Sequence, residues 1–256
     1  MSRIQKAFEN KKAFIAFLTA GDPSLDKTEE YILEMERAGA DLIEIGIPFS
    51  DPIAEGPVIQ EADIRALSGG VTTDDIFDMV KKLREKTEIP LVFMTYLNPV
   101  FHYGYEAFFE RCQDVGIDGI IIPDLPFEEK EEVDVVASRY GIDLISMIAP
   151  TSKERIRKIA KGAKGFLYVV SSMGVTGERT NITTDIGGML KEIRSVNSVP
   201  AAVGFGIHTP DQAAEICKTA DGVIVGSAVV KIVAQYGKDS AEKVGEFTKS
   251  LKEAMN

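Results

Sequence analysis

The sequence has few of the residues that form disulfides or metal sites. Its 256 residues include two cysteines, Cys112 and Cys217, and two histidines, His102 and His208. Both cysteines lie in stretches of helical pattern, and we expect them to be reduced and buried. Neither histidine has carboxylates at metal-ligand spacing, so we interpret both as loop or cap residues. These features argue against a disulfide scaffold and against a metal centre.

Long apolar runs are also missing. Asp, Glu, Pro or Gly interrupts every candidate before it reaches the roughly 18 to 20 residues that a membrane-spanning helix needs. The first residues, MSRIQK, have no apolar core of the signal-peptide kind and do not resemble a transit peptide. We therefore expect a cytoplasmic protein with no membrane partner, in which 45% hydrophobic residues supply a sizeable core.

Positive charge is scarce. The chain has 29 Lys and Arg against 40 Asp and Glu, a net charge of -11. Such a charge repels nucleic acid and anionic membranes, so we expect neither as a partner. Any phosphate ligand would have to be held by local donors, because the overall field opposes it.

Short apolar runs rich in Ile, Val, Leu or Phe recur along the chain, as is typical of strands buried on both faces of a parallel sheet. Amphipathic stretches of helical period lie between them. The predicted strands are residues 14–20, 42–49, 91–96, 119–125, 144–149, 166–171, 201–205 and 222–226. The predicted helices include residues 26–38, 74–86, 130–140, 153–161 and 210–219, with an N-terminal helix at 2–10.

The boundaries between these segments repeat as well. In GAD (39–41) and GID (116–118 and 141–143), a helix ends at a glycine and a strand begins after an aspartate. Eight strand–helix units in this length predict an α/β fold, a (β/α)₈ TIM barrel forming a single domain over residues 1–256, with the N-terminal helix covering its bottom. An open doubly wound sheet fits less well, because no Gly-x-Gly-x-x-Gly follows the first strand.

One predicted strand carries a charge among apolar residues. In LIEIGIPF (42–49), Glu44 shares a face with Leu42 and Gly46. If both faces are buried, this carboxylate points into the interior, beside a glycine that leaves an empty space. The alternative is a half-exposed strand with one outward glutamate. A buried carboxylate is costly unless it is paired or used, so the first interpretation predicts a functional site.

Glycines cluster at the strand ends where such barrels often bind phosphate. The segments are SSMGVTG (171–177), GFGI (204–207) and VGSA (225–228). Glycines let backbone N–H groups approach an oxyanion, and a helix N-terminus adds unpaired donors. A single glycine could simply form a turn, but three clusters on one rim favour a phosphate site.

The other strand ends predict a cavity that is partly apolar and partly acidic. Such a cavity suits an aromatic phosphorylated substrate that is changed by proton transfer, without a metal or covalent nucleophile. We interpret residues 51–57 and 173–180 as lids that close over it, the alternative being long turns.

Together these motifs resemble one family, the tryptophan synthase alpha chain, over essentially the whole sequence. The motifs are FLTAGDP (17–23), LIEIGIPFSDP (42–52), YLNP (96–99), PDLP (123–126), GVTG (174–177), GFGI and VGSA. The resemblance implies a lyase that cleaves indole-3-glycerol phosphate by a retro-aldol reaction to indole and glyceraldehyde 3-phosphate, in tryptophan biosynthesis.

The resemblance also implies roles for individual residues. Glu44 would be the catalytic acid–base group, Glu55 the second carboxylate where the family usually has aspartate, and Tyr168 the active-site tyrosine. Phosphate binding would fall on Gly177, Gly206, Gly226 and Ser227, and the indole pocket on Phe17, Met94 and Ile121.

A beta chain in an α₂β₂ heterotetramer is the implied partner, meeting this chain at Asp51, Asn98 and Pro126. The beta chain would use pyridoxal phosphate to make tryptophan from indole and serine, and this chain would need no cofactor or metal. The alternatives are a non-catalytic alpha-like activator and a stand-alone lyase. Another phosphate-binding barrel, such as an indoleglycerol-phosphate synthase or a phosphoribosyl isomerase, fits less well. Those enzymes use a lysine acid or an Asp/Cys pair at strand ends, and no predicted strand here contains lysine.

Overall fold

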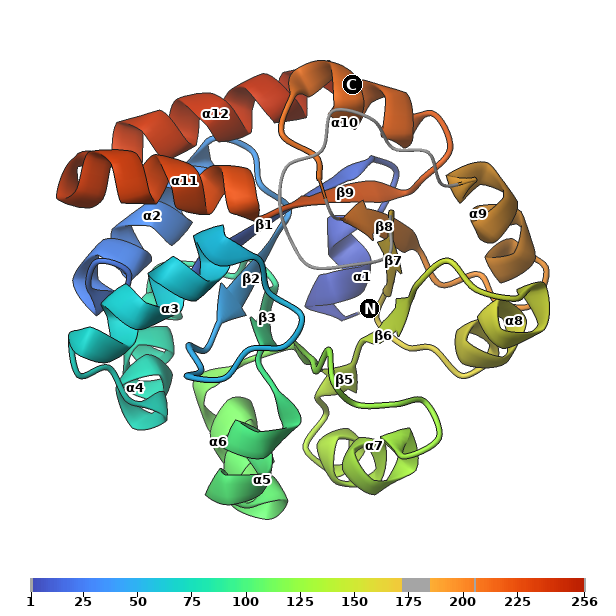
Figure 1. The fold of residues 1–256 in the computed structure, drawn as a ribbon, viewed down its shortest axis with the longest axis horizontal. Helices are drawn as coiled ribbons and strands as arrows, with labels where there is room; N and C mark the ends of the chain where they lie inside the picture. The colour runs from blue at the N-terminus through green and yellow to red at the C-terminus, as the bar shows by residue number, and fades with distance from the viewer. Residues whose placement is uncertain (1, 172–184, 205, 256) are drawn as a thin grey trace.

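The computed structural model describes residues 2–171, 185–204 and 206–255, and it confirms the predicted parallel barrel wrapped by helices (Figure 1). All strand pairs in the described residues are parallel, in the order β5-β4-β3-β2-β1-β9-β8-β7-β6. The strands are β1 (Ala13–Thr19), β2 (Leu42–Gly46), β3 (Leu91–Met94), β4 (Gly119–Ile121), β5 (Asp143–Leu144), β6 (Ser146–Ile148), β7 (Leu167–Val170), β8 (Ala201–Gly204) and β9 (Gly222–Val225).

The predicted fifth strand is divided in two, with Ile145 between the parts. Its first part, β5, pairs with β4, and its second part, β6, pairs with β7. The barrel therefore closes through this one segment, which joins the two ends of the sheet order.

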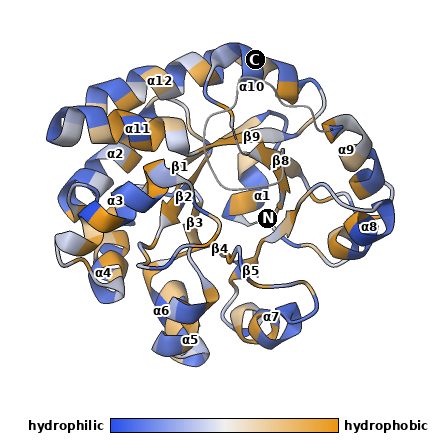
Figure 2. Ribbon diagram, in the orientation of Figure 1, coloured by the Kyte–Doolittle hydropathy of each residue, from blue (hydrophilic) through white to orange (hydrophobic). Residues whose placement is uncertain are grey.

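Helices cover this sheet, α1 at the bottom of the barrel and the others on its outer side (Figure 1). They are α1 (Arg3–Ala7), α2 (Leu25–Arg37), α3 (Pro57–Ser68), α4 (Thr73–Leu83), α5 (Leu97–Tyr103), α6 (Tyr105–Val115), α7 (Lys130–Arg139), α8 (Lys153–Lys161), α9 (Ile186–Arg194), α10 (Pro210–Cys217), α11 (Ser227–Tyr236) and α12 (Ala241–Ala254). Their apolar stripes face the sheet and their polar faces point outward, as Figure 2 shows. No helix in the described residues is long and apolar enough to cross a membrane.

Both faces of the strands are buried, as the continuous apolar runs predicted. All seven residues of β1 and all five of β2 are buried. One face packs against the surrounding helices and the other fills the barrel interior, so the core has an outer and an inner layer. Cys112 and Cys217 are buried free thiols in the outer layer, as expected.

Several predicted segments were too long. Strand 2 ends at Gly46 rather than residue 49, before Pro48, which has no N–H for a sheet ladder. The N-terminal helix ends at Ala7 rather than residue 10, and Asn10 takes a left-handed φ of 56°. This helix nevertheless closes the bottom of the barrel, because Ile4 and Ala7 join the inner core. The predicted end of strand 7, residue 205, lies outside the described residues.

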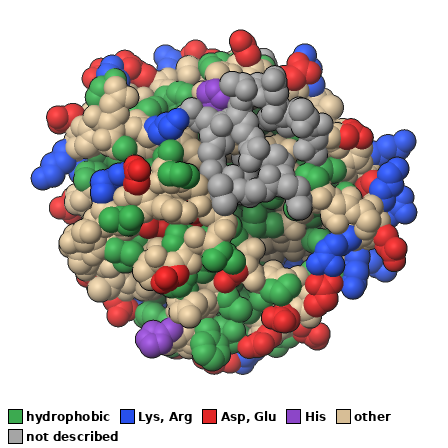
Figure 3. All heavy atoms as spheres, viewed as in Figure 1, with side chains coloured by type: hydrophobic (Ala, Val, Ile, Leu, Met, Phe, Trp, Pro, Cys, Tyr) green, Lys and Arg blue, Asp and Glu red, His purple; other side chains and the backbone are tan. Residues whose placement is uncertain are grey.

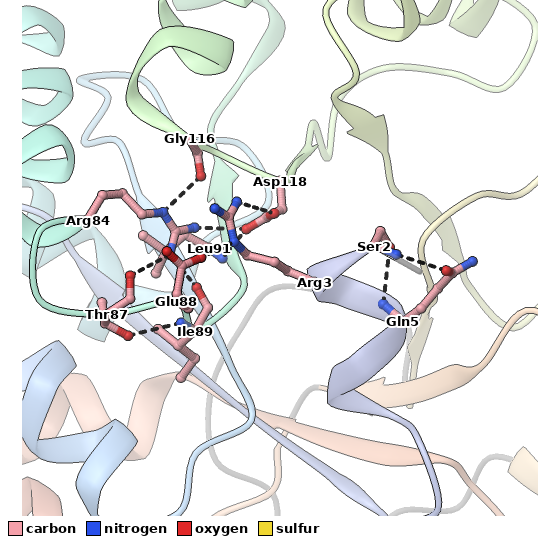
Figure 4. Close-up of polar contacts among 10 residues, drawn as sticks. All are labelled: Ser2, Arg3, Gln5, Arg84, Thr87, Glu88, Ile89, Leu91, Gly116 and Asp118. Atoms are coloured by element: carbon pink, nitrogen blue, oxygen red, sulfur yellow. Dashed lines mark hydrogen bonds and ion pairs between the residues drawn. The ribbon is translucent and has the colours of Figure 1, made fainter.

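An ion-pair cluster ties several loops together at the bottom of the barrel (Figure 4). Asp118 accepts hydrogen bonds from Arg84 Nη2 at 2.8 Å and from Arg3 Nη1 at 3.1 Å. Arg84 also donates to the Gly116 carbonyl at 2.9 Å, and Asp118 accepts the Leu91 N–H at 2.9 Å. Asp118 therefore joins α1, β3 and Arg84 just before β4, and Arg84 ties it to the Gly116 carbonyl.

A second cluster fastens the C-terminal helix to the same end. Asp41 is buried, and it accepts a hydrogen bond from the Phe14 N–H at 2.7 Å. The Lys252 Nζ of α12 and the Lys11 Nζ each lie 2.6 Å from its carboxylate. The aspartate that precedes a strand thus binds the chain terminus to the barrel.

We expect Arg84→Met to lower the free energy of unfolding by about 3 kcal/mol, because it leaves the largely buried Asp118 carboxylate, 10% exposed, with one cation fewer. Urea denaturation would measure the change. The matched control is Lys218→Met, which breaks an exposed pair with Glu215 and should change stability by less than about 0.5 kcal/mol. Equal effects of the two substitutions would contradict the structural role of Arg84.

Candidate active site at the barrel mouth

Glu44 lies inside the barrel. Its side chain is on β2, paired between Phe17 of β1 and Val92 of β3, and the residue is 1% exposed. Neither carboxylate oxygen has a hydrogen-bond partner among the described residues. The alternative of a half-exposed strand is therefore excluded. A carboxyl group placed in this way stays in the interior mainly in its neutral form.

The space beside Glu44 is not empty, so that prediction was wrong. A Cβ atom on Gly46 would lie 2.7 Å from Cζ of Phe17, and a Cβ on Gly226 would lie 3.2 Å from Cδ1 of the same ring. The Phe17 ring occupies the room that both glycines leave. These glycines therefore allow an aromatic ring to pack across the barrel next to the carboxyl group.

Tyr168 occupies a similar position on β7. A Cβ on Gly204 would lie 2.7 Å from its ring, so this glycine also makes room for an aromatic side chain. The inner core brings Tyr168 together with the three residues expected in the indole pocket, Phe17, Met94 and Ile121. All four are buried.

Glu55 reaches the same mouth from the loop between β2 and α3. It is 5% exposed, and the Tyr96 hydroxyl donates to its Oε1 at 3.4 Å. The Ala54 N–H donates to the Tyr96 oxygen at 2.9 Å. Tyr96 thus anchors the acidic loop from the neighbouring strand end. Tyr96 begins the YLNP motif, which gives no indication of this anchoring role.

A third buried acid, Asp63, was not predicted. It lies on α3, whose residues Ile59 and Ala62 contribute to the inner core. The signal for this helix was present in Pro57, a favoured first helical residue, followed by apolar residues at helical spacing.

Burial and the nearby Glu55 raise the pKa of several groups at the mouth. Burial, and then the nearby Glu55, raises the pKa of Glu44 to about 8. Burial, and then Glu55, raises the pKa of Asp63 to about 7. Burial likewise raises the pKa of Tyr168, with Glu44 and Glu55 adding to the effect. At neutral pH the Glu44 carboxyl is therefore largely protonated and available as a proton donor.

The glycine rim lies on the neighbouring strands β8 and β9. Gly206 has a φ of +85°, which favours glycine. Gly226 precedes α11 without a side-chain cap, and Ser227 is the first residue of that helix. The first N–H groups of α11 therefore have no partner within the helix and can bind an anion. The imidazole Nδ1 of His208 lies 2.9 Å from the Gly206 carbonyl oxygen. Gly177 and the predicted lid at 173–180 lie outside the described residues.

The residues expected at a partner interface are exposed and follow three adjacent strands. Asp51 follows β2, Asn98 follows β3 and Pro126 follows β4. The Leu97 N–H donates to Asp124 at 2.9 Å and so joins two of these loops. Two large apolar side chains were missed there: Ile53 is 74% exposed and Phe101 is 67% exposed. Exposed apolar side chains therefore accompany Asp51 and Asn98 after these strands.

The raised pKa of Glu44 predicts a pH-dependent stability. The carboxyl binds its proton more tightly in the folded chain, with a pKa near 8, than at its ordinary value of 4.5. Its contribution to stability is therefore fully present below pH 4.5 and is lost as pH rises through 8. Compared with the Glu44→Gln variant, the natural chain should lose about 1.4 kcal/mol of unfolding free energy for each pH unit between pH 4.5 and pH 8.

Urea unfolding of both proteins at several pH values between 5 and 9 would measure this difference. Groups common to the two chains cancel in the comparison. Parallel pH profiles would show that Glu44 ionises as an ordinary carboxyl group.

The sequence and the fold of this chain match known proteins over nearly the whole of both chains. The family model for the tryptophan synthase alpha chain matches residues 4–256. Alpha chains from Lacticaseibacillus casei and Caldanaerobacter subterraneus subsp. tengcongensis are each 48% identical to this chain, covering 100% of it and 96% and 100% of the relatives.

Solved structures agree with these sequence matches. A Legionella pneumophila tryptophan synthase alpha chain has a TM-score of 0.89 at 37% identity, covering 100% of this chain and 97% of that one. A chain of the Pyrococcus furiosus tryptophan synthase complex has a TM-score of 0.87 at 35% identity, covering 94% and 98%. The chain therefore belongs to the tryptophan synthase alpha chain family.

Proposed function

We propose that this chain is the lyase that cleaves indole-3-glycerol phosphate to indole and glyceraldehyde 3-phosphate in tryptophan biosynthesis. One observation carries the proposal: Glu44 is a buried carboxyl group with no hydrogen-bond partner among the described residues, inside a mouth lined by Phe17 and Tyr168. Family membership supplies the reaction, and this carboxyl group supplies the proton that the reaction needs.

Glu44 takes part in two proton transfers. It first donates to C3 of the indole ring, which gives a cationic indolenine. It then takes the proton from the hydroxyl on the side-chain carbon bonded to C3. The oxygen forms the aldehyde C=O bond, the carbon–carbon bond breaks, and its electron pair returns to the ring as indole. The proton from the hydroxyl replaces the one that Glu44 gave to C3, so the carboxyl group is restored at the end of the reaction.

Glu55 and Tyr168 assist this cycle. The Glu55 carboxylate stabilises the positive charge that develops on the ring nitrogen. It is one methylene longer than the aspartate usual in the family, and its hydrogen bond with Tyr96 holds the longer side chain in the mouth. Tyr168 forms the side of the aromatic pocket that lies opposite β1 and β2.

We place the substrate phosphate at Gly206, Gly226 and Ser227, and we assign Gly177, which lies outside the described residues, to the same role. The uncapped N-terminus of α11 supports this assignment, since it offers N–H donors without adding a charged side chain. Proton transfer and amide binding are sufficient for the reaction, so this chain needs no cofactor of its own.

We also propose that the chain works as the alpha subunit beside a beta chain that carries pyridoxal phosphate. The structures similar to it include an α₂β₂ tryptophan synthase complex from Pyrococcus furiosus. The exposed rim at Asp51, Ile53, Asn98, Phe101 and Pro126 is the surface we assign to that partner. A purely activating alpha-like role is less favoured, because Glu44, Glu55 and Tyr168 are all present in one buried mouth.

We expect Glu44→Gln to lower kcat by at least ~10²-fold, because the amide cannot exchange the proton. Indole release from indole-3-glycerol phosphate, measured with a beta chain present, would show the loss. Glu61→Gln, the same change on the exposed side of α3, should leave kcat unchanged. Near-normal turnover by a folded Glu44→Gln variant would refute the assignment.

We expect Ile53→Asp and Phe101→Asp each to weaken beta-chain binding by ~10-fold or more, since each puts a charge into an apolar contact. Titration of the beta chain against each variant would measure affinity. Val135→Asp, at a 55% exposed apolar position on α7, is the matched control and should bind normally. Unchanged affinity of both rim variants would place the partner elsewhere.

A further inference from the structure

Lys130 is a partly buried cation that the proposed reaction does not use. It is the first residue of α7, and its Nζ donates to the Ser146 hydroxyl on β6 at 3.0 Å. No carboxylate of the described residues forms an ion pair with it within 4 Å, whereas its neighbours Arg155 and Lys164 are paired with Glu128 and Asp134. A neutral hydroxyl is therefore the partner that the described residues supply.

This arrangement is energetically unfavourable for the chain alone. Lys130 is partly buried, and this burial lowers the pKa of its ammonium. Asp134 raises the pKa of Lys130, but it lies too far away to form an ion pair with it. A desolvated cation with a neutral partner is stabilised when an anion approaches.

A cavity of about 380 Å³ adjoins the Lys130 amine. It lies between the β4–α7 loop and α8, next to the break in the fifth strand. Its walls are largely apolar, and they include Leu125, Phe127, Leu144 and Ile159. Its volume falls in the range of small-molecule sites, about 300 to 1,000 Å³.

This cavity adjoins the inner core through Ile145, Met147 and Val170. Among the described residues, its lining contains none of those to which we assign catalysis, phosphate binding or indole binding. It does include Pro126, at the edge of the proposed partner surface. Arg155 also lines it, but its guanidinium is held by two hydrogen bonds to Glu128 at 2.9 and 3.1 Å. Figure 3 shows basic side chains gathered over α8, on the right of the view.

We propose that this cavity binds a small carboxylate with an apolar body. The carboxylate accepts hydrogen bonds from Lys130 Nζ and the Ser146 hydroxyl, and the body packs against Leu125 and Phe127. One ammonium and one hydroxyl match the two oxygens of a carboxylate. A phosphate dianion would need more donors than this apolar site offers.

The test is a calorimetric titration of the full-length chain with 3-phenylpropionate, in saturating indole and glycerol 3-phosphate to fill the catalytic mouth. We expect saturable binding at one site. Lys130→Met should weaken it at least tenfold and Ser146→Ala several-fold. The matched control is Lys153→Met, on the 77% exposed first residue of α8 outside the cavity, which should bind as the natural chain does.

The neutral analogue 3-phenylpropanamide separates carboxylate recognition from simple apolar binding, and it should bind at least tenfold more weakly. Circular dichroism would establish that each variant is folded. Equal affinity of the Lys130→Met variant, equal affinity for the amide, or no binding once the mouth is filled would each overturn the proposal. Because the readout is binding rather than indole release, the result does not depend on the proposed reaction.

Discussion

Burial of the Glu44 carboxyl group sets the conditions for everything else at the barrel mouth. A carboxylate in the barrel interior loses its water, so the proton stays bound at neutral pH, and the negative Glu55 nearby reinforces this. Glu44 has no hydrogen bond in the described residues to hold it in place, so the backbone must do so. Parallel pairing of β2 with β1 and β3 on either side provides that support.

Acidic side chains lie beside cations at the bottom of the barrel and beside another acid at its mouth. At the bottom, Asp118 and Asp41 are surrounded by cations and N–H donors, and these clusters join distant parts of the chain. At the mouth, Glu44 and Asp63 are buried beside another acid. The unfavourable arrangement lies where the proposed reaction needs a carboxyl group that keeps its proton at neutral pH, and the satisfied clusters at the other end offset its cost in stability.

Much of the fold could be predicted because strands buried on both faces leave continuous apolar runs, as in β1. The site was predictable where one residue contradicts its surroundings, as Glu44 does. Prediction failed where a role depends on distances in the folded chain. The space left by Gly46 holds Phe17, which comes from another strand. Asp63 joins the acids because α3 turns it inward. The break at Ile145 reflects closure of the barrel, which no local pattern records.

The neutral glycine rim has a consequence for how the enzyme meets its substrate in salt solution. Gly206, Gly226 and Ser227 contribute no charge, while the chain carries a net charge of -11. A doubly charged phosphate substrate bound there as proposed is repelled at long range and held by uncharged donors at short range. Dissolved ions screen the repulsion and leave the short contacts nearly intact. Encounter should therefore become faster as ionic strength rises, the reverse of what arginine-lined or lysine-lined phosphate pockets show.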